Sequence, residues 1–167
     1  MSTSLWNRRE ILAAASAAAL APLPSFAQAG TMMTREIAAS GEALPVIGLG
    51  TYSVLDVEST ASNIASRKAI VDLLIDAGGS LIDTSPMYNR SEAVIGDIIE
   101  AGVDRKDTFL ATKVWTDGED AGKAQMQRSA ELMQTDVIDL MQVHNLRDTP
   151  VHMNTIREWQ DEGRIRY

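Results

Sequence analysis

The stretch LIDTSPMYNRSEAVIG, residues 81–96, opens with an apolar run that ends at Asp83, and Tyr88 follows in a proline-containing loop. Such a run after two glycines predicts a short buried strand over residues 80–83, with a carboxylate at its carboxyl end. An aspartate at this place often does no more than end the strand and cap the turn that follows. Whether Asp83 has a structural role or a role in a functional site depends on how the other strands of the chain end.

Strand-like and helix-like patterns alternate along the chain after residue 34. A small hairpin turning at Ser40-Gly41 is predicted first. Four strands are then expected, each followed by a helix, over residues 46–50, 80–83, 107–114 and 137–144. Four strand-helix units of this kind define an α/β fold with parallel strands. Doubly wound sheets and (β/α) barrels share this alternation, although GLGTYS lacks the third glycine of a dinucleotide-binding fingerprint.

The helices are predicted from apolar residues that recur at helical spacing. The first is expected to end at Gly78-Gly79, the second to begin at an N-cap Ser91, the third to span residues 122–134, and the last to end at Gly163. The side chains expected to face the core are Ile70, Leu73, Leu74, Ala77, Val94, Ile95, Ile98, Ile99, Met126, Ala130, Met133, Ile156 and Trp159. The final letters RIRY are typical of the opening of one more strand.

Polar side chains stand at the carboxyl ends of three consecutive predicted strands. Asp83, Lys113 and His144 are separated by 113 − 83 = 30 and 144 − 113 = 31 residues. One strand-helix unit separates each residue from the next, so all three are expected at the same end of a parallel sheet, with Tyr88 above them. Each residue alone also has a structural explanation, as a cap, a loop anchor or a solvated strand end. Their shared position at the ends of consecutive strands favours a functional site.

The four residue types suit the reduction of a carbonyl group. A phenol is a weak acid at neutral pH, and a nearby ammonium such as that of Lys113 makes it a stronger one. Asp83 can keep the ammonium charged, and a neutral His144 can donate a hydrogen bond to the carbonyl oxygen. Hydride would then come from a nicotinamide cofactor.

These motifs resemble the aldo-keto reductases, a family of NADP(H)-dependent (β/α)8 TIM barrels. The segments LPVIGLGTY, LIDTSPMYNRSEAVIG, FLATKVW, DLMQVHN and EGRIRY follow the order of the family's first-half motifs over residues 34–167. The resemblance implies that Asp83, Tyr88, Lys113 and His144 form the catalytic tetrad, with Tyr88 as general acid.

The resemblance also implies the contacts of the ligands. Gly50, Thr51 and Asp83 would approach the NADP(H) cofactor, and Trp115 with His144 would line the mouth for a small carbonyl substrate. Asn89 stands where the family usually has glycine, and asparagine tolerates the left-handed backbone that this turn needs.

The composition argues against several other classes of partner. The net charge of −8 disfavours nucleic acids and anionic membranes, which are bound by basic surfaces. The chain has no cysteine and two histidines, which argues against a metal site built from these residues.

The first 29 residues are predicted to be a signal peptide of the twin-arginine type. They hold the pair Arg8-Arg9, an apolar run too short to span a bilayer stably, and the cleavage pattern Ala27-Gln28-Ala29. We therefore expect export to the periplasm. Translation from Met32 or Met33 would instead give a cytoplasmic protein.

The family's barrel needs roughly 250 residues, whereas residues 30–167 are predicted to form its N-terminal half, with the first four strand-helix units and the start of the fifth strand. Open sheet edges favour self-association of such a half barrel. We also expect that the isolated chain neither binds NADPH measurably nor reduces carbonyls, because the resembled family holds the cofactor's phosphates with later loops. A non-catalytic nucleotide-sensing or regulatory barrel and an inactive truncated fragment remain alternatives to a reductase of aldehydes or ketones.

Overall fold

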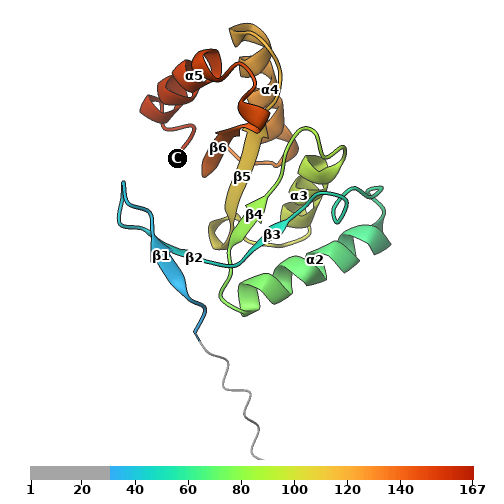
Figure 1. Cartoon of the computed structure of the whole chain (residues 1–167). Helices are drawn as coiled ribbons and strands as arrows, with labels where there is room; N and C mark the ends of the chain where they lie inside the picture. The colour runs from blue at the N-terminus through green and yellow to red at the C-terminus, as the bar shows by residue number, and fades with distance from the viewer. Residues whose placement is uncertain (1–30) are drawn as a thin grey trace, which may run out of the picture. The chain divides into compact units, whose positions relative to one another are not determined.

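A four-stranded parallel sheet organises the part of the chain that the computed structural model describes, residues 31–167 (Figure 1). Its strands lie side by side in chain order and are β3 (Gly48–Gly50), β4 (Leu81–Asp83), β5 (Phe109–Val114) and β6 (Leu140–Val143). The predicted alternation is therefore confirmed. The predicted export signal lies outside the described residues.

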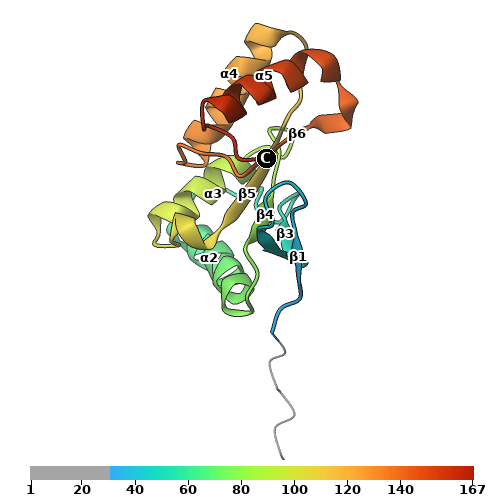
Figure 2. The same cartoon turned by 90° about the vertical axis from the view of Figure 1, so that its left-hand side faces the viewer.

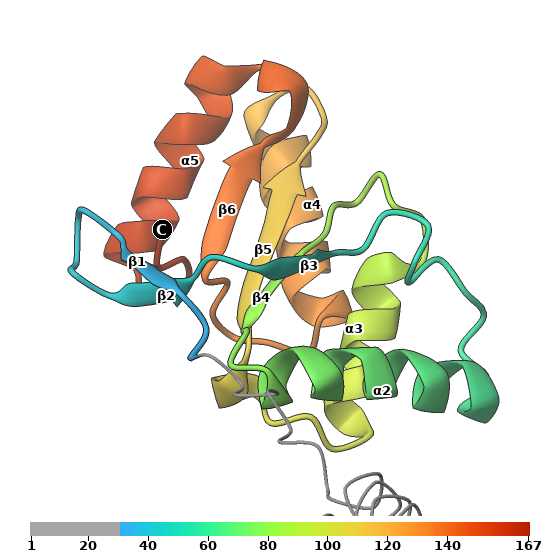
Figure 3. The same cartoon turned by 60° about the horizontal axis from the view of Figure 1, so that its bottom comes forward.

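A helix follows each strand of this sheet. These helices are α2 (Ala61–Asp76), α3 (Ser91–Glu100), α4 (Glu119–Leu132) and α5 (Thr149–Asp161), and the short 3₁₀ helices are η1 (Arg105–Asp107) and η2 (His144–Leu146). Each α-helix contacts the next one in the chain, as Figures 2 and 3 show from two sides.

The strand order β3-β4-β5-β6 separates the two fold classes that the sequence left open. Parallel crossover connections are right-handed in nearly all proteins, so connections that always step in one direction place their helices on the same side of the sheet. A doubly wound sheet needs a reversal of the strand order, which this sheet does not contain within residues 31–167. The sheet is wound as part of a (β/α) barrel.

Two predictions at the ends of the described region are confirmed. The hairpin pairs β1 (Thr34–Glu36) with β2 (Ala43–Pro45) in antiparallel register, and Gly41 at its turn has a φ of 74°. At the other end, Ile165 forms a parallel bridge to Ile138, and the Met141 amide donates to the Tyr167 carbonyl. The residues RIRY thus begin to pair beside β6, as their pattern indicates.

The core lies between the sheet and its helices. In β5, Leu110, Thr112 and Val114 alternate with Lys113 and are completely buried. The core cluster joins such strand residues to Val94, Ile95, Ile98, Met126, Met133, Ile156 and Trp159 of the helices and their ends. The apolar faces predicted for α3, α4 and α5 are confirmed.

The apolar face predicted for α2 is wrong. Ile70 and Leu73 are 38% and 69% exposed, and Val71 is the buried residue of this helix. Leu74 is partly buried against the core. Apolar residues are spread around the whole circumference of α2, so spacing alone does not select the face that meets the sheet.

Two predicted helix starts are also wrong. Arg90, not Ser91, is the N-cap of α3, and the Ser91 hydroxyl donates 3.3 Å across to the Thr51 carbonyl. Helix α4 begins at Glu119, three residues before the predicted start, because Gly118 with a φ of 82° precedes it and the acidic Glu119 and Asp120 suit a helix N-terminus. None of the helices in residues 31–167 is long and apolar enough to cross a membrane.

Glu92 of α3 is a buried carboxyl that accepts a 2.6 Å hydrogen bond from Thr112 Oγ1. Burial raises its pKa above the ordinary value of 4.5. The folded state therefore holds the proton more tightly than the unfolded state does. As the pH rises above 4.5, ionisation of Glu92 progressively lowers the stability of the folded state.

We expect Glu92→Gln to raise the free energy of unfolding at neutral pH, because glutamine does not titrate. This gain should disappear at pH values below the pKa that Glu92 has in the unfolded chain. Urea unfolding at acidic and neutral pH measures this difference. Glu100→Gln, at an exposed position of the same helix, is the matched control. A Glu92→Gln effect that is equal at both pH values would contradict a buried titrating carboxyl.

Candidate active site

Polar side chains project from the carboxyl ends of the strands on the face away from the helices. Ile82, Val114 and Met141 belong to the core cluster beneath the helices. Because successive strand residues point to opposite faces, Asp83 and Lys113 point to the other face. The register places Lys113 directly opposite Gln142, and Gly50 opposite Asp83.

Lys113 and Asp83 form an ion pair at this end of the sheet. Lys113 Nζ lies 2.7 Å from Asp83 Oδ2 and also donates to the Thr84 carbonyl at 2.8 Å. Gln142 Nε2 donates to the second oxygen, Asp83 Oδ1, at 2.9 Å. The Lys113 side chain is only 12% exposed. The carboxylate and the ammonium are therefore held in fixed positions, as the sequence pattern anticipates.

Tyr88 lies beside this pair. Its ring centre is 5.3 Å from Lys113 Nζ and 6.0 Å from the His144 ring centre, with an angle of 89° between the two rings. Tyr52 packs edge to face on the same ring at 5.3 Å. The loop bends sharply after Tyr88, where Asn89 has a φ of 49°. The left-handed turn expected at Asn89 is confirmed.

His144 begins η2 directly after β6. Its Nδ1 is 2.9 Å from Ser85 Oγ. Partial burial lowers the pKa of His144 below 6.5, the positive charge of Lys113 lowers it further, and Asp83 opposes both effects. The imidazole is therefore favoured in its neutral form at neutral pH, which suits a hydrogen-bond donor to a carbonyl oxygen.

The remaining predicted site residues lie around the same end of the sheet. Gly50 is exposed at the end of β3, and open space lies where a Cβ would project from it. Thr51 is buried and its amide donates to the Asp83 carbonyl. Trp115 follows β5 and is 36% exposed. The Arg147 guanidinium lies over its ring, 4.8 Å from the ring centre.

Exposed apolar side chains gather in the loops that follow the strands. Tyr52, Met87, Trp115 and Leu146 are between 36% and 79% exposed. The first three belong to the loops after β3, β4 and β5, and Leu146 ends η2 after β6. A small hollow of about 80 Å³ lies among Tyr52, Ser53, Asp56, Tyr88 and Asn89. Within residues 31–167, no group of three His, Cys, Asp or Glu side chains is placed to hold a metal ion.

Two polar residues of the site were missed from the sequence. Gln142 could have been found from the sequence, because it is a polar residue within an apolar strand. It lies two positions before His144, and residues two apart in a strand point to the same face. Ser85 has no comparable signal, since a serine after a strand is common in turns. Only the fold brings Ser85 to His144, across 59 positions of the chain.

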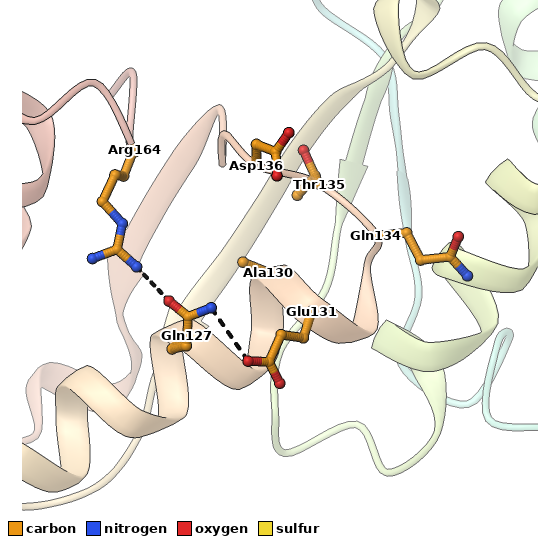
Figure 4. Close-up of a pocket in the computed structure, with 7 residues that line it drawn as sticks. All are labelled: Gln127, Ala130, Glu131, Gln134, Thr135, Asp136 and Arg164. Carbon is orange, nitrogen blue, oxygen red and sulfur yellow. Dashed lines mark hydrogen bonds between the residues drawn. The ribbon is translucent and has the colours of Figure 1, made fainter.

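A separate hollow of about 330 Å³ lies near the amino end of β6 (Figure 4). It is lined by Gln127, Ala130, Glu131, Gln134, Thr135, Asp136 and Arg164. Gln127 links Arg164 to Glu131 through two hydrogen bonds. The aspartate, tyrosine, lysine and histidine of the other end are absent from its lining, so we place the site at the carboxyl ends of the strands.

The fold and these residues define a candidate site at the carboxyl ends of the strands of a (β/α) barrel. The model of the aldo/keto reductase family matches residues 46–167, and the chain belongs to this family. Human aldo-keto reductase family 1 member C2 is 31% identical over 110 residues, which are 62% of this chain and 32% of the human protein.

Two further relatives support the same assignment. The 9,11-endoperoxide prostaglandin H2 reductase of Trypanosoma cruzi is 36% identical over 103 residues, covering 60% of this chain and 34% of its own. The crystal structure of a Klebsiella pneumoniae aldo-keto reductase in complex with NADPH matches with a TM-score of 0.68 and 29% identity, over 81% of this chain and 48% of its own. The chain thus spans about a third of the length of the curated relatives that it matches.

Proposed function

We propose that the protein is an NADP(H)-dependent oxidoreductase that reduces aldehydes or ketones to alcohols. The observation that carries this proposal is that the Tyr88 ring lies close to both His144 and the Asp83–Lys113 ion pair, at the carboxyl ends of adjacent parallel strands. Active sites of (β/α) barrels lie at this end of the strands. Membership of the aldo/keto reductase family supports the same activity.

Each residue has a distinct role in the proposed reaction. Tyr88 gives its hydroxyl proton to the carbonyl oxygen as the carbonyl carbon receives hydride, so the carbonyl becomes an alcohol. The ammonium of Lys113 favours the resulting phenolate, and Asp83 keeps that ammonium charged and in place. His144 donates a hydrogen bond to the carbonyl oxygen and orients it.

The residues present fit one part of a nicotinamide cofactor. Such a cofactor would supply the hydride when bound. Gly50 leaves open space beside Asp83, and the Asp83 side chain is 37% exposed. A carboxylate has about four acceptor positions, and Lys113 and Gln142 use two of them, so Asp83 can still accept from a ribose hydroxyl.

The proposal is tested by NADPH fluorescence titration and by NADPH consumption with a panel of small aldehydes and ketones. The assays use the 167-residue chain and any longer chain that contains it. In a chain that binds NADPH, we expect consumption that depends on the carbonyl and yields one alcohol per NADPH oxidised. Lys113→Met, which removes the charge and keeps the length of the side chain, should abolish most of the turnover. Absence of NADPH binding and of turnover in every such chain would refute the proposal.

A further inference from the structure

Ser85 is a buried hydroxyl that joins the loop after β4 to the start of η2. Its side chain is inaccessible to solvent, and its Oγ lies 2.9 Å from His144 Nδ1. The same Oγ accepts a hydrogen bond from the Met87 amide at 3.2 Å. The hydroxyl oxygen is therefore fixed between a backbone donor and one nitrogen of the imidazole ring.

The hydroxyl proton of Ser85 needs an acceptor, because a buried donor without a partner destabilises the folded state. Among the described residues, the two hydrogen-bond partners of Ser85 Oγ are the Met87 amide, which can only donate, and His144 Nδ1. The proton therefore goes to Nδ1. A neutral imidazole that accepts at Nδ1 carries its own proton on Nε2.

We propose that Ser85 is a positioning residue that selects the Nε2–H tautomer of His144. The His144 ring centre lies 6.0 Å from the Tyr88 ring centre. Because Nδ1 is engaged by Ser85, Nε2–H is the ring N–H left to donate to a ligand oxygen in this site. In the other tautomer a bare Nε2 lone pair would meet the carbonyl oxygen and repel it. The consequence for catalysis rests on the proposed function, whereas the tautomer itself does not.

Three charged or titratable groups surround His144 in this site. Lys113 and Asp83 act on it through their charges, and Tyr88 packs against it. None of the three forms the hydrogen bond to Nδ1, which belongs to Ser85. Replacement of Ser85 therefore removes the tautomer selection and leaves the Asp83–Lys113 ion pair in place.

The tautomer is measured by NMR of the 167-residue chain labelled with ¹⁵N-histidine, using the nitrogen shifts and the couplings to the ring protons. Signals that vanish in His144→Gln belong to His144. We expect the wild type to hold the Nε2–H tautomer, Ser85→Ala to show a mixture of both, and Ser85→Thr, which keeps a hydroxyl, to restore the wild-type pattern. Amide spectra of the three chains check that the fold is unchanged.

The second readout is kcat for carbonyl reduction, measured with a form of the protein that reduces carbonyls. Removal of one oxyanion donor costs roughly 10²-fold in kcat, and Ser85→Ala removes this donor only in the molecules that hold the other tautomer. We therefore expect kcat to fall in proportion to the Nε2–H fraction that NMR measures, by about two-fold for an equal mixture, with an unchanged KM for NADPH and recovery in Ser85→Thr. An Nδ1–H tautomer in the wild type, or an unchanged tautomer in Ser85→Ala, overturns the proposal. A changed tautomer with unchanged kcat overturns the catalytic role, while the turnover of the wild type tests the proposed function separately.

Discussion

Tyr88→Phe is expected to lower kcat for carbonyl reduction by roughly 100-fold or more, the scale of general acid catalysis. The substitution removes the hydroxyl that would protonate the carbonyl oxygen and keeps the ring that packs against Tyr52 and His144. NADPH affinity should stay nearly unchanged, because the proposed cofactor contacts lie at Gly50, Thr51 and Asp83. Steady-state kinetics and NADPH fluorescence titration measure the two quantities.

Tyr52→Phe is the matched control for this experiment. It makes the same chemical change on the neighbouring ring, whose residue is 70% exposed and stands outside the proposed proton transfer. We expect its kcat to stay close to that of the wild type. Full turnover by Tyr88→Phe would exclude this phenol as the acid and would favour a nucleotide-binding regulatory role for the barrel.

Gly96→Ala is expected to destabilise the fold by about 1–3 kcal/mol, the usual cost of overpacking a filled contact. A Cβ at this position of α3 would lie 2.1 Å from the Leu132 carbonyl oxygen at the end of α4. The obstacle is backbone, so no side-chain rotation removes it. Helix propensity alone predicts the opposite sign, since alanine is favoured over glycine by about 1 kcal/mol in a helix.

Ala93→Gly, in the same helix, measures that propensity separately. We expect it to cost about 1 kcal/mol, with no steric contribution. Urea denaturation monitored by circular dichroism gives the free energy of unfolding for both variants. Equal or greater stability of Gly96→Ala would show that α3 and α4 can move apart at this contact without cost.

Much of the site could be predicted from strand ends alone. In a parallel sheet every carboxyl end lies at one edge, so the intervals between Asp83, Lys113 and His144 were sufficient to bring these residues together. The contacts of Gln142 and Ser85 depend on the register of β5 against β6 and on the path of a loop. Spacing along the chain contains neither, because register is set by the packing of both strands at once.

The buried face of α2 could not be predicted for a related reason. Its apolar residues do not form a single stripe, and the sheet selects Val71 while Leu73 stays exposed. The requirement for glycine at position 96 could not be predicted from the sequence either. The need for glycine there comes from the Leu132 carbonyl of another helix, so no pattern around residue 96 contains it.

Each strand-helix unit contributes its own part to the site, and this division sets what can vary independently. Asp83 and Lys113 stand on strands fixed by hydrogen bonds to their neighbours, whereas Tyr52 and Trp115 stand in exposed loops beyond the strands. Loops accept insertions and substitutions more readily than the elements that they connect. A lineage of such proteins can therefore exchange the loop after β3 or β5, and with it the molecules admitted, without rebuilding the Asp83–Lys113 ion pair. Substrate recognition and the position of the ion pair can therefore change through separate mutations.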